Sequence, residues 1–352
     1  MDLQKYGFTP EMLSKGGQGI PARVIAVHKE RFALVCDYGE IYGRLKTKVY
    51  FDGSELFPTT GDFVLIQYNP CGDSIIIRTL PRKTFFSRRD PTPGRGEQAV
   101  AANVDYVFIM QSLNQDFNDH RLERYLTLGW QSGATPVVVL TKADLMEDCS
   151  SYIQQAETLA IGAAVHAVSS KSGMGLDALK AYLKPGKTVV FLGSSGVGKS
   201  SLVNALAGET VMAVKEIREA DDKGRHTTTH RQLIMLKNGA MVIDTPGMRE
   251  LGMWDATDGL HSVFGDVEQF LGRCRFSDCR HQTEPGCAIR EAIESGILSP
   301  ERWENYSKLK RETKFCNNKA AYLERKRKKF IDIAKTNRKG SKHHKDWLTE
   351  EV

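Results

Sequence analysis

The segment that most constrains this chain is "GSSGVGKSS", from Gly193 to Ser201. It follows the apolar stretch "TVVFL" and precedes "KSSLVNALAG", whose apolar residues have helical spacing. A glycine-rich turn with the pattern G-x-x-x-x-G-K-[ST], set between a buried strand and a helix, is typical of a phosphate-binding loop. Its backbone N–H groups and the helix N-terminus attract phosphate oxygens. We therefore expect an α/β domain with a nucleotide site at this turn.

Two further residue roles follow from this assignment. Lys199 is expected to reach the β- and γ-phosphates, and the hydroxyl of Ser200 is expected to hold Mg²⁺. The residues predicted to surround the phosphates are Gly193, Ser194, Ser195, Gly196, Val197, Gly198, Lys199, Ser200 and Ser201. Downstream, "VIDTPG" is an apolar strand ending in D-x-x-G. We expect Asp244 to act on Mg²⁺ through water and the Gly247 N–H to contact the γ-phosphate.

A base-reading motif, "TKAD", follows the apolar stretch "PVVVL". The carboxylate of Asp144 can accept hydrogen bonds from guanine N1–H and the exocyclic amine, which adenine does not supply, so GTP is favoured over ATP. The predicted base-binding residues are Thr141, Lys142, Ala143 and Asp144. GTP-binding proteins usually have Asn where Thr141 stands, which leaves one supporting hydrogen bond in question. "VSSKSG", at residues 168–173, is expected to close over the base.

The order of these motifs is unusual, because the base-reading loop precedes the phosphate loop. Both kinds of loop lie at the carboxyl ends of parallel strands, where such sheets bind ligands. Segments that are neighbours in space can occur in a different order along the chain. The site is therefore retained if the original N- and C-termini are joined and new termini are formed elsewhere. The order therefore predicts a circular permutation, in which the segment after "DTPG" leads directly into the C-terminal region.

Two other regions differ from this α/β pattern. Residues 20–80 contain about five short β-rich runs separated by Gly and Asn-Pro turns, which predicts a small barrel, OB-like or SH3-like. From residue 104 onward, continuous apolar strands alternate with helices, which indicates a parallel sheet covered on both faces. A chain of 352 residues is long enough for two or three domains. We expect a multidomain fold with the α/β domain in the middle.

Three of the seven cysteines lie between Cys274 and Cys287. The segment "CRFSDCRHQTEPGC" presents Cys274, Cys279, His281 and Cys287, a closed set of three thiolates and one imidazole that suits structural zinc. The odd cysteine count and the N-terminus "MDLQKYGFTPEMLSK", which has no apolar core for a signal peptide, argue against a disulfide framework. We expect one zinc ion per chain in a cytoplasmic protein that makes no membrane contact.

The positive charge is concentrated at the C-terminal end. Residues 301–352 hold 16 Lys and Arg against 8 Asp and Glu, so this segment carries +8 while the rest of the chain sums to −2. This basic tail indicates a polyanionic partner, although a solvated surface is the usual role of a charge run. The Pro- and Arg-rich segment at 81–98 has the composition of a linker, and a solvated connector and an RNA-contacting loop are equally compatible with it.

Taken together, the permuted motifs, "GRHTTTH" at residues 224–230, the N-terminal barrel and the Cys/His cluster resemble the family of ribosome small-subunit-dependent GTPase A (RsgA) over nearly the whole chain. The resemblance implies an OB fold, a permuted GTPase domain and a zinc-binding domain. We place the OB-like barrel at residues 1–85, a basic linker at 86–100, the permuted GTPase domain at 101–255, and the zinc-binding domain with its basic helical tail at 256–352. It also implies slow GTP hydrolysis stimulated by the 30S ribosomal subunit during late maturation, and binding to 16S rRNA. We expect a monomer that binds GTP and GDP, with Mg²⁺ accompanying GTP.

The resemblance also implies a catalytic residue. Met248 stands where many GTPases have the Gln that orients water, and it cannot do so. The family's substitute is the histidine that matches His226, and Thr228 is expected to complete the Mg²⁺ coordination. The alternative is that His226 only contacts phosphate or RNA. Two other classes of function compete, an ATPase and an RNA-binding protein in which GTP only fixes shape; Asp144 argues against the first.

Overall fold

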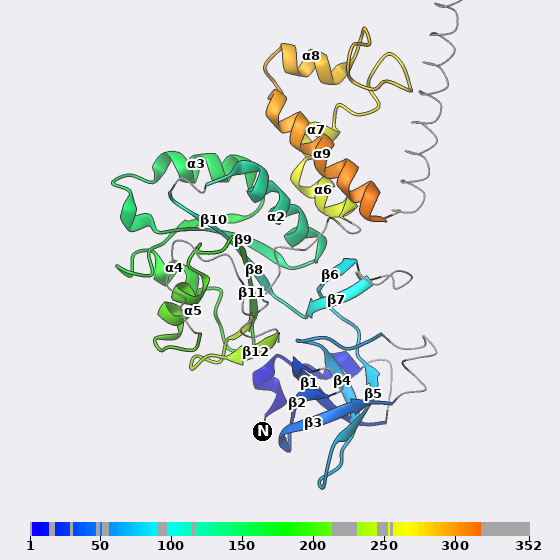
Figure 1. The fold of residues 1–352 in the computed structure, drawn as a ribbon, viewed down its shortest axis with the longest axis vertical. Coiled ribbons are helices and arrows are strands. Elements are labelled where there is room, and N and C mark those ends of the chain that lie inside the picture. The colour runs from blue at the N-terminus through cyan, green and yellow to red at the C-terminus, as the bar shows by residue number, and fades with distance from the viewer. Residues whose placement is uncertain are drawn as a thin grey trace, which may run out of the picture.

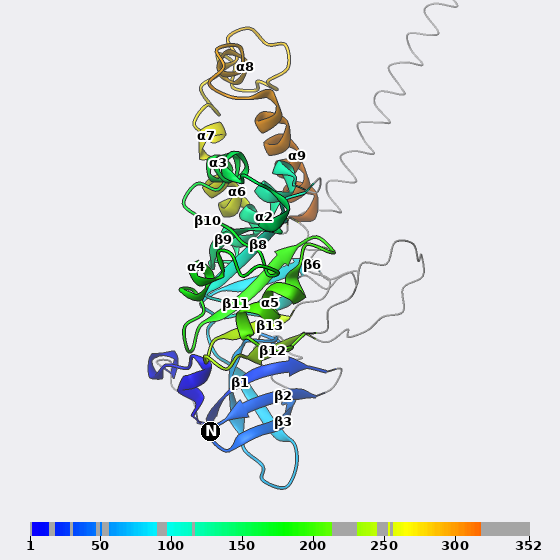
Figure 2. The same cartoon turned by 90° about the vertical axis from the view of Figure 1, so that its left-hand side faces the viewer.

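The structure is a computed structural model. The residues it describes are 2–13, 18–28, 31–46, 50, 56–89, 97–114, 117–212, 231–244, 253 and 256–317. They form an elongated molecule in which a β-barrel, an α/β domain and a helical domain follow one another along the long axis (Figures 1 and 2). Among these residues, no helix is both long enough and apolar enough to cross a membrane.

The N-terminal region is a closed five-stranded barrel preceded by two short 3-10 helices, η1 (Leu3–Tyr6) and η2 (Pro10–Leu13). Its strands are β1 (Ile20–Val27), β2 (Phe32–Cys36), β3 (Gly39–Leu45), β4 (Phe63–Gln67) and β5 (Ser74–Thr79). The strand order is β1-β2-β3-β5-β4, and β4 pairs back with β1. The pairing of β3 with β5 is parallel and the others are antiparallel. This Greek-key closure confirms the OB-like alternative.

The central sheet has the order β10-β9-β8-β11-β13-β12. Its strands are β8 (Tyr106–Ser112), β9 (Thr135–Thr141), β10 (Ala164–Ala167), β11 (Thr188–Gly193), β12 (Gln232–Met235) and β13 (Met241–Asp244). All pairings are parallel except the one between β12 and β13. Strands β8 to β10 come before β11 in the chain, yet β11 lies between β8 and β13. The phosphate-loop strand is therefore central although it is fourth in sequence, as the permutation predicts.

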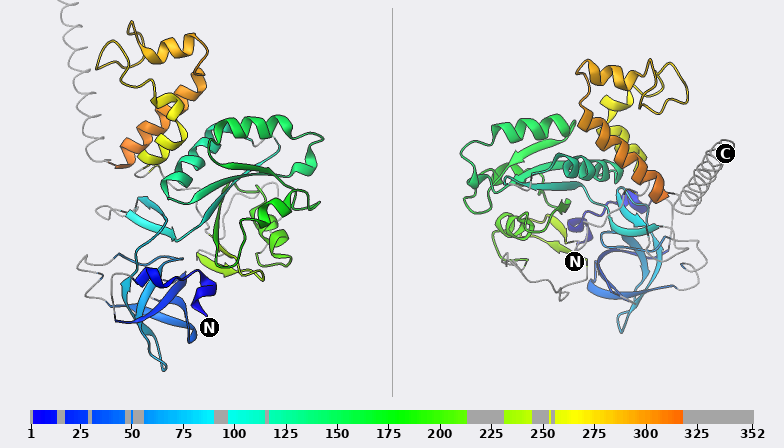
Figure 3. Two further views of the ribbon diagram at one scale, coloured as in Figure 1. Left: turned by 180° about the vertical axis from the view of Figure 1, so that it is seen from behind. Right: turned by 45° about the horizontal axis from the view of Figure 1, so that its top comes forward.

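Helices cover both faces of this sheet, as the continuous apolar strands predict. Helices α2 (Asp119–Gln131) and α3 (Ser150–Leu159) pack on one face, where the core includes Leu122, Leu126 and Ala156. Helices α4 (Leu176–Lys180) and α5 (Lys199–Ala207) cover the other, with Leu179 and Leu202 fully buried. Figure 1 shows these two layers above and below the strands, and Figure 3 shows them from behind.

The segment expected to be a linker contains regular structure. Strands β6 (Phe85–Arg89) and β7 (Glu97–Ala102) form an antiparallel hairpin. Phe86 and Val100 are 3% and 2% exposed and belong to the same apolar core as the central sheet. The Pro and Gly residues between the strands suggested a connector, but apolar residues on either side pair and pack against the α/β domain.

The C-terminal region is helical: α6 (Thr257–Val263), α7 (Gly265–Glu268), α8 (Ala288–Glu294) and α9 (Pro300–Asn317). Helix α9 begins at Pro300, and Ser299 caps it, since the backbone N–H of Arg302 donates to the hydroxyl of Ser299 at 3.1 Å. Helix α6 packs on α2, which joins this region to the α/β domain (Figure 2).

A buried ion network fixes that junction. Glu123, on α2, is 2% exposed and accepts hydrogen bonds from Arg302 and Asn305 of α9. Arg302 also contacts both carboxylate oxygens of Asp266, at 2.9 and 3.0 Å. Burial raises the pKa of Glu123, and the Arg302 guanidinium opposes that shift. The helical region is therefore held against the α/β domain by a buried ion network, in which loss of one charge would leave its partner buried without a counter-charge.

A second junction joins the barrel to the central sheet. Arg23, in β1, is 1% exposed and donates from Nη2 to the hydroxyl of Thr188 at 2.9 Å and to the carbonyl of Asn103 at 3.2 Å. Its other nitrogens donate to the carbonyls of Tyr6 and Gly61. Burial lowers the pKa of Arg23 to about 10, so the guanidinium stays charged at neutral pH. Strand β1 also pairs with β12, which makes one continuous 11-stranded sheet.

Candidate nucleotide and metal sites

The predicted phosphate loop lies between β11 and α5, at the carboxyl edge of the sheet. Gly196 and Gly198 have φ values of 72° and 101°, which favour glycine because a side chain is strained there. A Cβ added to Gly193 would lie 2.9 Å from Val197 in the same loop and 3.1 Å from Met110 in β8. Ser200 and Ser201 lie in the first turn of α5. The loop therefore needs its glycines, as the motif indicates.

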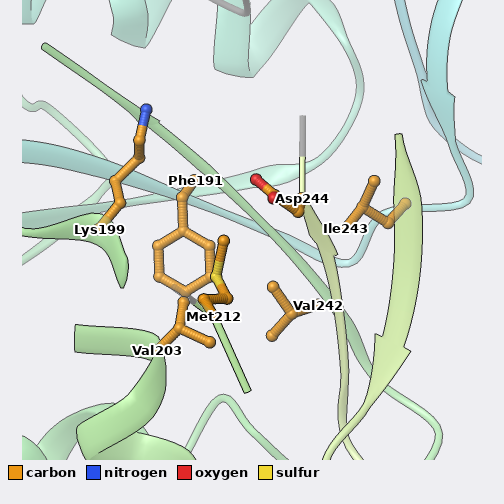
Figure 4. Close-up of a pocket in the computed structure, with 7 residues that line it drawn as sticks. All are labelled: Phe191, Lys199, Val203, Met212, Val242, Ile243 and Asp244. Carbon is orange, nitrogen blue, oxygen red and sulfur yellow. The ribbon is translucent and has the colours of Figure 1, made fainter. Parts of the chain in front are cut away.

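Lys199 and Asp244 line one pocket beside this loop, together with Phe191, Val203, Met212, Val242 and Ile243. In Figure 4 the ammonium and carboxylate groups lie at one end of the pocket and apolar side chains fill the other. The Lys199 ammonium donates to the carbonyl of Gly193 at 3.4 Å. Burial raises the pKa of Asp244, and the charge of Lys199 acts in the opposite direction. The sheet thus brings the predicted phosphate-binding cation and the predicted Mg²⁺-side carboxylate together.

The predicted base-reading loop follows β9 at the same edge. Lys142 has a φ of 60°, and η3 (Ala143–Leu145) begins directly after it. The backbone N–H of Ala143 donates to the carbonyl of Val168 at 3.1 Å. The Asp144 side chain is exposed at the surface, where it is accessible to a ligand. This arrangement positions the predicted guanine-binding carboxylate on a loop with a fixed backbone.

Ser169 supports that carboxylate, and it was not among the predicted base-binding residues. Its hydroxyl donates to Asp144 Oδ1 at 2.6 Å and accepts from the backbone N–H groups of Lys171 and Ser172 at 3.2 and 3.1 Å. The Ser169 hydrogen bond is the main cause of a lowered pKa for Asp144, which keeps the carboxylate ionised. The sequence indicated the segment 168–173 as a cover for the base, but it gave no sign that Ser169 contacts Asp144.

Thr141 connects the two loops. Its hydroxyl lies 2.7 Å from the carbonyl oxygen of Val197 in the phosphate loop and 3.3 Å from that of Gln111, at the end of β8. Thr141 is 3% exposed and Val197 is 1% exposed. One hydroxyl therefore joins β8, β9 and the loop after β11, and the atypical threonine ties the predicted base-reading loop to the predicted phosphate loop.

The four predicted metal ligands come together in the C-terminal region. Cys274, Cys279, His281 and Cys287 each present one ligand atom, and these atoms lie within 4.8 Å of one another. His281 Nδ1 is 3.5 Å from the sulfur of Cys274 and 3.4 Å from that of Cys287. Zn–S bonds of about 2.3 Å in a tetrahedron place two sulfurs roughly 3.8 Å apart, and the sulfurs of Cys274 and Cys287 are 4.0 Å apart. This donor set can hold a metal ion.

Local contacts fix the shape of that loop. The Glu284 carboxylate accepts hydrogen bonds from the backbone N–H groups of Arg280, Gln282 and Thr283 at 2.9 to 3.0 Å, which lower its pKa to about 2. The ring of Trp303, on α9, packs edge-on against His281 with centroids 5.2 Å apart. The cluster is therefore attached to the helix that also contacts the α/β domain.

Three predicted site residues, His226, Thr228 and Gly247, lie outside the described residues, and so does the basic tail beyond residue 317.

Together, a phosphate loop and a guanine-type base loop at one sheet edge, in permuted chain order, define a circularly permuted GTPase. A family model described as RsgA GTPase matches residues 79–254. The chain belongs to the RsgA GTPase family and is a GTP hydrolase.

Similar proteins support this assignment. "Small ribosomal subunit biogenesis GTPase RsgA 1" of Listeria innocua is 45% identical over 341 residues, which cover 96% of this chain and 97% of that protein. The protein of that name from Oceanobacillus iheyensis is 40% identical, covering 94% of this chain and 96% of its own.

Two solved structures are also similar. The crystal structure of YjeQ from Thermotoga maritima has a TM-score of 0.61 at 28% identity and covers 84% of this chain and 98% of its own. That of YloQ, described as a circularly permuted GTPase, has a TM-score of 0.56 at 26% identity and covers 84% of this chain and 95% of its own.

Proposed function

We propose that this protein binds the small (30S) ribosomal subunit through 16S rRNA and hydrolyses GTP slowly, at a rate that the subunit stimulates, late in subunit maturation. The names of the similar proteins support the subunit as partner. The observation that carries the nucleotide part is the contact between Thr141 and Val197, because it joins a base-reading loop to a phosphate loop in one site. The protein acts as a cytoplasmic monomer.

In this proposal the phosphates lie against the backbone N–H groups of residues 193–201 and the Lys199 ammonium. Ser200 and Thr228, which belongs to the "GRHTTTH" segment, would hold Mg²⁺, and Asp244 would act on it through water. The ion would neutralise charge on the phosphates. Asp144, oriented by Ser169, pairs with the guanine ring edge. The Gly247 N–H contacts the γ-phosphate, and His226 orients the attacking water, since an imidazole can accept or relay a proton.

The metal cluster is proposed to be a structural zinc site. Three thiolates and one imidazole would supply all four ligands of a zinc ion and leave no position for substrate, so the ion would stabilise the loop and take no part in hydrolysis. The three domains are the barrel, the permuted GTPase domain and the zinc-binding domain. Since the β6–β7 hairpin packs with the central core, we place it with the GTPase domain.

The deciding experiment is GTP turnover of the full chain with and without purified 30S subunits. We expect stimulation by 30S subunits, little by 50S subunits, and no comparable turnover of ATP. Deleting residues 320–352 is expected to lower subunit affinity and its dependence on salt, because fewer phosphates are neutralised. If subunits bind but phosphate release is absent, the protein is an RNA-binding module in which GTP only fixes shape.

A further inference from the structure

The barrel contacts strands β12 and β13 through one short turn. Residues 59–62, which we call the barrel turn, lead into β4 and are all buried. The Thr60 hydroxyl donates to the carbonyl of Arg231, the residue directly before β12, at 3.3 Å. Gly61 lies against β13, since a Cβ added to it would be 3.1 Å from Cδ1 of Ile243. The barrel turn therefore contacts both strands of this pair.

A single row of paired residues connects the barrel with Asp244. Ala26 of β1 pairs with Gln232 of β12, and Gln232 in turn pairs with Asp244 at the end of β13. Figure 2 shows β12 between β13 and β1. Neighbouring strands lie about 4.8 Å apart, so the backbone of β1 is roughly 10 Å from that of Asp244. A displacement of β12 relative to the barrel would therefore also displace Asp244, its partner in the row.

Arg231 fixes the start of β12 in this row. Its carbonyl accepts the hydrogen bond from Thr60, and its Nη1 donates to the carbonyl of Ala99 in β7 at 3.3 Å. The barrel and the β6–β7 hairpin thus hold the residue next to Gln232 from two sides. Loss of the Thr60 contact would loosen the strand that pairs with Asp244.

The barrel turn is held firmly enough to support this strand. The buried Asp62 carboxylate accepts hydrogen bonds from two nitrogens of the Arg82 guanidinium at 2.8 Å, and one from the backbone N–H of Thr59 at 2.7 Å. Gly61 has a φ of 94°, and a Cβ added to it would collide with the carbonyl oxygen of Ala102. The turn therefore packs directly against the end of β7 and has little room to move.

The position of Asp244 matters because of the ion on which it is proposed to act. Asp244 lines the same pocket as Lys199 and Ile243 (Figure 4). Mg²⁺ demands near-ideal octahedral geometry, with ligands at about 2.0–2.1 Å, so a small displacement of a group that holds one of its waters weakens binding. Gly61 contacts Ile243, one residue from that carboxylate. The barrel turn thus reaches the lining of the pocket itself.

We propose that Thr60 is a positioning residue for Mg²⁺ binding. By holding Arg231 it keeps β12 in place, and β12 keeps Asp244 where its carboxylate can act on the ion. The barrel thereby supports the nucleotide site from outside the GTPase domain. The inference rests on the proposed function in taking Asp244 as the carboxylate that acts on Mg²⁺.

The test titrates Mg²⁺ into the full-length protein bound to a fluorescent, non-hydrolysable GTP analogue. Thr60→Val removes the hydroxyl at nearly constant volume and is expected to raise the Mg²⁺ concentration at half-saturation roughly two- to tenfold, the weight of one hydrogen bond. Affinity for the analogue in EDTA should stay at the parent's value, because the phosphate and base loops are unchanged. Thr60→Ser keeps the hydroxyl and should keep the parent's Mg²⁺ midpoint.

Thr59→Val is the matched control for loss of a buried hydroxyl. The Thr59 hydroxyl also donates at 3.3 Å, but to the carbonyl of Val100 in the β6–β7 hairpin. Both valine variants should lower the melting temperature by similar amounts, and only Thr60→Val should change the Mg²⁺ midpoint. An unchanged midpoint in Thr60→Val, or an equal rise in both variants, would overturn the proposal.

A second measurement uses the unchanged protein. If the barrel turn supports Mg²⁺ binding, the bound ion must stabilise the same contacts in return. Adding Mg²⁺ to the analogue complex is expected to slow hydrogen exchange in residues 59–62 and in β12, with little change in β3. Equal exchange of the barrel turn with and without Mg²⁺ would contradict the proposal. Failure of the proposed role of Asp244 is distinct, since Asp244→Asn would then leave the Mg²⁺ midpoint unchanged.

Discussion

The hydroxyl of Thr141, at the end of β9, donates a 2.7 Å hydrogen bond to the carbonyl oxygen of Val197 in the phosphate loop. The sequence left open which supporting contact is lost when threonine replaces the usual asparagine. Here the shorter side chain reaches the phosphate loop directly, because β9 and β11 both flank β8 and end at the same edge of the sheet. The predicted base-reading loop and the predicted phosphate loop therefore share one buried contact.

Replacing Thr141 with valine removes this contact at nearly constant volume. The buried Val197 carbonyl then lacks that donor, which typically costs about 1–3 kcal/mol, so we expect GTP and GDP affinities to fall roughly 5- to 100-fold. Fluorescent-nucleotide titration measures both. Thr141→Ser keeps the hydroxyl and should remain close to the parent. Equal affinities in the valine variant and the parent would show that the contact does not hold the loops.

Guanine selectivity is expected to depend on Asp144. Asp144→Asn replaces an acceptor by an amide, so GTP affinity should fall by at least about tenfold while xanthosine triphosphate binds better than in the parent. Competition titration with both nucleotides checks this. Asp148→Asn, a nearby exposed carboxylate that caps the N–H of Ser150, serves as the control and should leave nucleotide choice unchanged. A variant that still prefers GTP would contradict the base-reading assignment.

His226 is expected to affect chemistry more than binding. His226→Ala should lower GTP turnover by about 10²-fold or more, the usual contribution of a positioned acid–base group. Nucleotide dissociation constants should stay close to the parent's, because Lys199 and the loop N–H groups are unchanged. Single-turnover hydrolysis and equilibrium binding separate the two effects. Unchanged turnover would mean that another group, such as one on the RNA, orients the water.

The zinc site is expected to be structural. Cys279→Ser should lower the metal content below one zinc per chain and expose the segment around Cys274–Cys287 to protease, while GTP binding stays near the parent's. Atomic absorption and limited proteolysis measure the two effects. Cys71→Ser is a matched control, since Cys71 is exposed and lies in the barrel. Full zinc occupancy in the Cys279 variant would contradict the assigned ligand set.

The attachment of the C-terminal region is expected to depend on Arg302. Arg302→Met leaves Glu123 buried without its main counter-charge, which typically costs about 3–5 kcal/mol. Adding Glu123→Gln should restore much of that loss. Arg290→Met breaks only the exposed pair with Glu294 and should cost less than about 1 kcal/mol. Urea unfolding and hydrogen exchange in α9 report the difference. Equal effects of Arg302→Met and Arg290→Met would contradict a buried network.

Local chemistry explains which features could be predicted from the sequence. The phosphate loop, Asp144 and the Cys/His cluster each fit in a short segment, where residue type and spacing set the backbone geometry and the available ligands. The placement of both loops at one edge also follows, because ligand-binding loops lie at the carboxyl ends of the strands of a parallel sheet. The segment at 86–100, predicted to be a linker, shows the limit of prediction from local sequence. Its prolines and glycines indicated a connector, yet Phe86 and Val100 are buried against a core formed by distant residues.

Contacts between distant residues were decided only by the tertiary structure. Arg23 meets Thr188 across 165 residues of chain, and Arg302 meets Glu123 across 179. No local pattern shows that such charges are buried, because burial depends on which surfaces of separate domains come together. The same holds for Ser169 and Thr141. Serine and threonine are common residues, and only the fold places these two hydroxyls where they support the loops. The sequence thus determined the ligand chemistry of each loop, and packing decided which side chains hold the loops and domains in position.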